Sequence, residues 1–127
     1  MGICAQYAKS RGVRLSIEPL NRFETDFMNT VDQGLEFIRD FQSDTVGLYL
    51  DTFHMNIEEK SIPGAIRKCA DRLFGFHACA NDRGTPGEDH LDWIGIKHAL
   101  KDVDYKGALV IESFTPDCKV IARAASM

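Results

Sequence analysis

The sequence has no Cys-x-x-Cys pair, no run of Lys or Arg, and no apolar stretch approaching the roughly 20 residues of a membrane span. Its four widely spaced cysteines argue against a zinc knuckle or a thioredoxin-type motif, and we expect reduced thiols in an intracellular protein. The formal net charge of -4 gives no reason to expect nucleic acid or an anionic membrane as a partner. A small, uncharged partner fits this charge better. No signal-peptide pattern is present, so a cytoplasmic location is expected.

Helical and strand patterns alternate along the whole sequence. The spacing of apolar residues predicts helices over 3–11, 30–41, 63–73, 92–100 and 120–125, and short apolar runs predict strands over 13–18, 46–50, 74–78 and 108–111. Thr30 and Gln33 form a capping-box pattern, and Asp92 can cap the helix that follows it. Segments 51–60 and 79–92 are expected to be loops. The alternation predicts one α/β domain over residues 1–127, with a leading helix and four strand–helix units around a parallel sheet.

Acceptor-rich side chains stand at the ends of all four predicted strands: Glu18, Asp51, His77 and Glu112. The carboxyl ends of parallel strands meet at one edge of a sheet, so these side chains should lie close together. Three carboxylates and one imidazole suit one divalent cation, Mn²⁺ first, with Mg²⁺ or Co²⁺ as alternatives. Without a cation the carboxylates would have to take up protons or move apart. Taken singly, each carboxylate could be a helix cap or a solvated loop residue, but four acceptors in succession favour a metal site.

Three further polar residues lie a few positions beyond these strand ends. Glu24 follows the first strand, His54 the second and Arg83 the third. Each of them can contact a polar ligand at the same edge of the sheet, although a solvated loop residue is the simpler interpretation of any one of them alone.

Several segments together carry a family resemblance: Ser16–Thr25, Leu50–Asn56, His77 with Asn81–Gly87, and Val110–Phe114. These segments, with the intervals between residues 18, 51, 77 and 112, resemble the D-tagatose 3-epimerase/D-psicose (allulose) 3-epimerase family of the xylose isomerase-like TIM barrels. The resemblance implies one divalent metal bound by Glu18, Asp51, His77 and Glu112. It also implies that Glu18 and Glu112 are the catalytic acid and base, and that the substrate is contacted by Glu24, His54 and Arg83.

The activity that the resemblance implies is a ketose 3-epimerase. In such an enzyme the metal holds O2 and O3 of a ketose, one glutamate removes the C3 proton to give a cis-enediolate, and the other glutamate returns a proton to the opposite face. Two alternatives stay open. One is another sugar or sugar-phosphate isomerase or epimerase of the superfamily, such as a hydroxypyruvate isomerase, and the other is a catalytically silent metal-binding half-barrel.

The length of the chain departs from this family pattern. A TIM barrel needs eight strands and typically about 250 residues, whereas this chain resembles the C-terminal half alone. Four open parallel strands would leave two unpaired edges and an uncovered inner face. We therefore expect either self-association or a missing N-terminal half-barrel to complete the fold.

Overall fold

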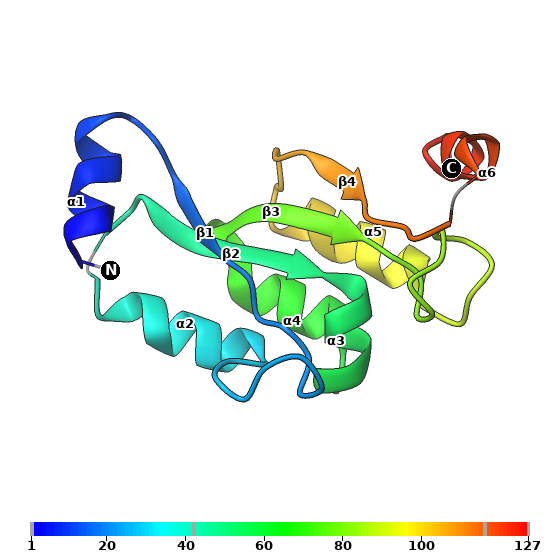
Figure 1. Ribbon diagram of the computed structural model, residues 1–127, viewed down its shortest axis with the longest axis horizontal. Helices are drawn as coiled ribbons and strands as arrows, with labels where there is room; N and C mark the ends of the chain where they lie inside the picture. Colours follow the sequence, from blue (N-terminus) through cyan, green and yellow to red (C-terminus); the bar gives the residue numbers. More distant parts are fainter. Residues whose placement is uncertain (1, 42, 116, 127) are drawn as a thin grey trace.

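A parallel β-sheet forms the centre of the computed structural model, which describes residues 2–41, 43–115 and 117–126. The described residues contribute four strands in the order β1-β2-β3-β4, with every neighbouring pair parallel. The strands are β1 (Leu15–Ile17), β2 (Val46–Asp51), β3 (Leu73–Ala78) and β4 (Leu109–Ile111) (Figure 1). The predicted α/β class and the predicted places of the strands are confirmed.

Helices precede and follow the strands as the alternation predicts. They are α1 (Gly2–Ser10), α2 (Val31–Arg39), α4 (Ile62–Cys69), α5 (Trp93–Asp102) and α6 (Cys118–Ala124). The predicted capping box is present, because Gln33 N–H donates to Thr30 Oγ1 at 3.3 Å and Thr30 N–H donates to Gln33 Oε1 at 3.1 Å. Asp92 caps α5 by accepting from Gly95 N–H at 2.9 Å. In the described part of the chain, no helix is long and apolar enough to span a bilayer.

Two local predictions are wrong. The expected loop over 51–60 contains a further helix, α3 (Thr52–Glu58), which begins directly after β2 because Asp51 Oδ1 accepts from Phe53 N–H at 2.6 Å and so caps its first turn. The helix expected to continue to Leu73 ends at Cys69 and is followed by a 3₁₀ turn, η1 (Ala70–Arg72). Leu73 instead pairs with Leu48 of β2, so pairing with the neighbouring strand overrides the helical spacing.

The hydrophobic core lies on one face of the sheet, here called the outer face, under α2, α4 and α5 (Figure 1). Gly34 of α2 allows a close approach to β2, because a Cβ at this position would lie 2.9 Å from Leu48 Cδ1. Side chains that are at most 1% exposed in this layer are Val31, Val46, Leu48, Leu50, Ile66, Cys69, Phe76 and Ala99. The helices thus fasten β2 and β3 from one side.

The opposite, inner face of the sheet is more open. Asp51, His77 and Val110 are register partners in successive parallel strands and therefore point to this face together. Val110 is 42% exposed. Strands β1 and β4 have a neighbour on one side only within the described residues, so the expected open edges are present. The candidate ligands lie at the carboxyl end of the inner face.

Candidate metal centre and ligand-binding residues

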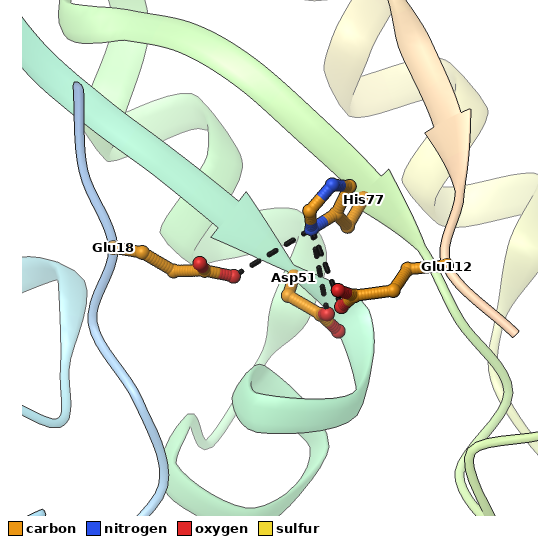
Figure 2. Close-up of side chains that lie close together, drawn as sticks. All are labelled: Glu18, Asp51, His77 and Glu112. Carbon is orange, nitrogen blue, oxygen red and sulfur yellow. Dashed lines mark ion pairs between the residues drawn. The ribbon is translucent and has the colours of Figure 1, made fainter. Parts of the chain in front are cut away.

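The carboxyl ends of the four strands bring together the four acceptors found in the sequence. Asp51 ends β2 and His77 is the next-to-last residue of β3, while Glu18 and Glu112 directly follow β1 and β4. One ligand atom of each residue lies within 4.8 Å of all the others, and Figure 2 shows the carboxylates directed toward the imidazole. The predicted convergence is confirmed, and a group of this kind could hold a metal ion.

Nδ1 of His77 is the atom around which the carboxylates gather. It lies 3.3 Å from Glu112 Oε2, 3.7 Å from Glu18 Oε1 and 3.8 Å from Asp51 Oδ2. This buried nitrogen has no hydrogen-bond partner within residues 2–41, 43–115 and 117–126. A buried polar atom without a partner is costly, and a divalent cation would accept its lone pair while offsetting the repulsion between the carboxylates. The donor set therefore fits a hard divalent metal.

The aromatic ring of Tyr49 packs against the imidazole of His77. The ring centroids of Tyr49 and His77 are 4.4 Å apart, with the planes tilted by 55°. The phenol ring also lies over Gly75, where any side chain would collide with it. The absence of a side chain at Gly75 thus leaves room for the aromatic support of His77.

The carboxyl groups differ in their affinity for protons. Burial, followed by a hydrogen bond to Glu112, raises the pKa of Asp51 to about 7. The pKa of Glu112 is lowered, chiefly by the same hydrogen bond. Burial raises the pKa of Glu18. Without a cation the group therefore retains a proton at a pH where isolated carboxylates have lost theirs, in line with the proton uptake expected from the sequence.

Arg83 supplies positive charge to the same group. Its Nη1 donates to Asp51 Oδ2 at 2.9 Å and to Glu112 Oε2 at 2.8 Å. The guanidinium lies over the rings of Phe53 and Phe114, with its carbon 4.2 and 5.5 Å from their centroids. The backbone of Arg83 has a φ of 63°, which L-residues rarely adopt, and its carbonyl accepts from Phe114 N–H at 2.9 Å. This turn directs the side chain into the strand-end group.

His54 and Glu24 lie next to Arg83. His54 is a buried residue of α3, and its Nε2 lies 2.9 Å from Arg83 Nη2. Glu24 lies in the loop after β1, and its Oε1 is 3.9 Å from both His54 Nδ1 and Arg83 Nη2. The structure therefore gathers the three predicted ligand contacts into one polar group beside the four candidate metal ligands.

Two residues that the sequence analysis did not single out support this arrangement. Asn21 is buried, and its backbone N and side-chain Nδ2 lie 3.1 and 2.8 Å from His54 Nδ1. Thr52 Oγ1 accepts from Cys79 N–H at 2.8 Å and donates to Cys79 O at 2.5 Å, which ties the end of β2 to that of β3. Both residues act through hydrogen bonds to residues far away in the sequence, and the spacing of apolar residues gives no sign of such contacts.

Comparison with known proteins bears on this geometry. A family model described as xylose isomerase-like TIM barrel matches residues 1–127. The chain belongs to this family. A probable ketose 3-epimerase of Synechocystis sp. is 44% identical over 115 residues, which cover 91% of this chain and 40% of that protein. The D-psicose 3-epimerase of Agrobacterium fabrum is 43% identical over 110 residues, which cover 87% of this chain and 38% of that protein.

Solved structures agree with the sequence relatives. The crystal structure of a D-psicose 3-epimerase in the presence of D-fructose superposes with a TM-score of 0.86 at 38% identity, covering 98% of this chain and 43% of that one. The resemblance to ketose 3-epimerases and the partial TIM-barrel fold are thereby confirmed. The chain spans less than half the length of each of these relatives.

Proposed function

We propose that this chain forms part of a divalent-metal-dependent ketose 3-epimerase. The observation that carries the proposal is the approach of four ligand atoms, from Glu18, Asp51, His77 and Glu112, to within 4.8 Å of one another. We assign the cation as Mn²⁺, with Mg²⁺ or Co²⁺ as alternatives, because the set is rich in oxygen and contains one nitrogen. The relatives named ketose and D-psicose 3-epimerases support the choice of reaction.

Glu18 and Glu112 are proposed as the two catalytic groups. They follow β1 and β4, the two edge strands of the described sheet, and so approach His77 from opposite sides (Figure 2). Epimerisation requires one group to remove the C3 proton and another to return a proton to the other face. Burial raises the pKa of Glu18, a shift in the direction that favours a group able to take up and return a proton. When bound, the cation would polarise the C2 carbonyl and acidify the C3 proton.

Glu24, His54 and Arg83 are proposed to bind the sugar. Their polar atoms lie together on one side of the metal ligands, where hydroxyl and carbonyl oxygens of a ketose can accept from Arg83 and the hydroxyl groups can donate to Glu24. These contacts would hold C2 and C3 over the metal ligands. Binding of this kind would hold the C3 proton close to the glutamate that removes it, so that the proton transfer takes place between groups already in position.

Residues 1–127 are proposed to act as one unit equivalent to the C-terminal half of a barrel, in the cytoplasm. The open inner face and the one-sided pairing of β1 and β4 support completion by an N-terminal half-barrel or by a second copy. A complete set of candidate metal ligands on this half is compatible with either form of completion.

The reaction is tested on the complete barrel, with this chain alone as a comparison. Incubation with Mn²⁺ and D-fructose, D-tagatose or D-psicose in D₂O should yield the C3 epimer carrying deuterium at C3, detected by NMR. Glu18→Gln and Glu112→Gln should each abolish epimer formation. Absence of any epimer from the complete barrel would refute the proposed reaction. Metal binding without epimer formation would instead support a catalytically silent module.

A further inference from the structure

The ring of His54 faces hydrogen-bond donors at both of its nitrogens. The backbone N–H of Asn21 lies 3.1 Å from Nδ1, and Nδ2 of the same residue lies 2.8 Å from it. On the other side, Nη2 of Arg83 lies 2.9 Å from Nε2. A neutral imidazole has one accepting nitrogen and one N–H, so it can accept on one side only.

The orientation of the Asn21 amide decides which side accepts. Its Oδ1 accepts from Phe23 N–H at 3.0 Å, and its Nδ2 donates to Glu24 Oε1 at 2.8 Å. Exchanging oxygen and nitrogen would place an acceptor against the Glu24 carboxylate and a donor against the Phe23 N–H. Nδ2 is therefore the atom that faces His54, and its second hydrogen is available to Nδ1.

The backbone of Asn21 leads to the same conclusion. Asn21 is 2% exposed, and its main-chain N–H cannot rotate to another acceptor, so burial without a partner would cost free energy. The Arg83 guanidinium already donates through Nη1 to Asp51 and Glu112, so its charge is paired even when Nη2 has no acceptor on His54. Nδ1 of His54 therefore accepts and Nε2 carries the proton. Burial, followed by the charge of Arg83, lowers the pKa of His54, which keeps the ring in this neutral form.

With the proton on Nε2, two donors face each other across 2.9 Å, one from His54 and one from Arg83. They cannot bond to each other, but both can donate to one oxygen that lies beside them. We propose that Asn21 is a positioning residue that fixes the Nε2–H form of His54 and orients Glu24, so that His54 and Arg83 donate jointly to one oxygen of a polyhydroxylated ligand. The identity of that ligand as a ketose rests on the proposed function, whereas the protonated nitrogen does not.

The first test reads the imidazole directly, without sugar or metal. Long-range ¹H–¹⁵N NMR spectra of the native chain should show an unprotonated Nδ1 and a protonated Nε2 for His54, whose signals are assigned by their loss in His54→Gln. A proton on Nδ1 in the native protein would overturn the proposal. In Asn21→Asp, a carboxylate oxygen replaces the Nδ2 donor while the backbone N–H stays, so the fraction of His54 with a protonated Nδ1 should rise.

Asn29→Asp is the matched control within the same loop. Asn29 Nδ2 donates to Leu20 O at 2.7 Å and Thr25 O at 2.9 Å, so this substitution also disturbs the loop. The His54 spectrum should nevertheless stay native. Equal changes of this spectrum in both variants would reduce Asn21 to a structural role and overturn the proposal.

The second test concerns the ligand. In the complete barrel, Asn21→Asp should raise KM for the ketose about tenfold, the equivalent of one lost hydrogen bond, while calorimetry gives an unchanged affinity for Mn²⁺. A changed His54 spectrum with an unchanged KM would refute the positioning of the ligand. If the native barrel has no epimerase activity, the reaction is refuted, but the NMR result still decides which nitrogen carries the proton.

Discussion

The two faces of the sheet differ in how far the chain itself covers them. On the outer face, Val46 and Leu48 are fully buried beneath the helices. On the inner face, Val110 is 42% exposed, and Glu18 and Glu112 are partly exposed. Over β2 and β3 the described residues therefore close the side of the sheet that holds the hydrophobic core, while the side that carries the candidate metal ligands stays open. At β4 the outer face is open as well, because Leu109, the register partner of Phe76, is 55% exposed.

This difference indicates that stability and chemistry can be altered separately. Burial of apolar side chains under α2, α4 and α5 stabilises the fold. At the strand ends, carboxylates lie near one another, and both their mutual repulsion and the burial of Asp51 destabilise the charged forms. Substitutions in the outer layer should therefore weaken folding, and substitutions among the four strand-end acceptors should weaken metal binding without weakening folding.

The largest expected effect is on metal affinity. Asp51→Asn should weaken Mn²⁺ binding by about 100-fold or more in calorimetry, because a charged ligand is replaced by a neutral amide. The fold should survive, since the amide oxygen can still accept from Phe53 N–H and a buried charge has been removed. Asp71→Asn, whose native side chain is 90% exposed, is the control and should bind Mn²⁺ as the native chain does. Loss of folding in Asp51→Asn would contradict the expectation that metal binding can be weakened without weakening the fold.

The next effect concerns pH in the absence of metal. Because the pKa of Asp51 is raised to about 7 in the folded chain and is about 3.9 in an unfolded one, the folded chain binds the extra proton between these values. The contribution of Asp51 to the free energy of unfolding should therefore fall as pH rises from about 4 to about 7. Urea unfolding with EDTA should show this fall in the native protein relative to Asp51→Asn. Parallel curves for the two proteins would contradict the assigned pKa.

A pair of valines compares the covered outer face at β2 with the open inner face at the edge strand β4. Val46→Ala should lower the free energy of unfolding by about 2 kcal/mol, because two buried methyl groups are lost from the outer layer. Val110→Ala should lower it by less than about 1 kcal/mol, because that side chain is already partly in water. Both proteins are measured by urea unfolding without metal. Equal losses would show that the inner face is also closed, for example by a second copy of the chain.

The smallest expected effect is the change in Mn²⁺ affinity on removing the guanidinium of Arg83. Its guanidinium bonds to Asp51 and Glu112, so it should compete with a cation for these carboxylates. Arg83→Gln should tighten Mn²⁺ binding several-fold, about 1 kcal/mol, at a pH above 7. Arg39→Gln removes the same charge from an exposed position on α2 and should leave the affinity unchanged. Weaker binding by Arg83→Gln would indicate that Arg83 supports the metal ligands.

The strand ends were predictable because of their local chemistry. Apolar runs that end in Glu18, Asp51, His77 and Glu112 indicate parallel strands with acceptors at one edge, and the structure brings these residues together. Helix α3 was not predictable in the same way. Phe53, Met55 and Ile57 alternate with polar residues, so their spacing hides the helix that the Asp51 cap begins.

The contacts of Asn21 lay beyond sequence reasoning for a different reason. Asn21 and His54 are separated by 33 positions, and their contact depends on the path of the loop between β1 and α2, which has no regular period. The backbone turn at Arg83 is similar, because a positive φ at an arginine is a product of its surroundings. Sequence patterns predicted which groups would meet but not the hydrogen bonds that orient them.

The central claim is that the four strand-end acceptors bind one divalent cation, and anomalous diffraction tests it most directly. In crystals grown with Mn²⁺, we expect one strong anomalous peak between the carboxylates and His77 Nδ1, with Arg83 displaced from Asp51 and Glu112. The claim is contradicted if the strongest peak lies elsewhere, or if no peak is present and Arg83 still bonds to both carboxylates.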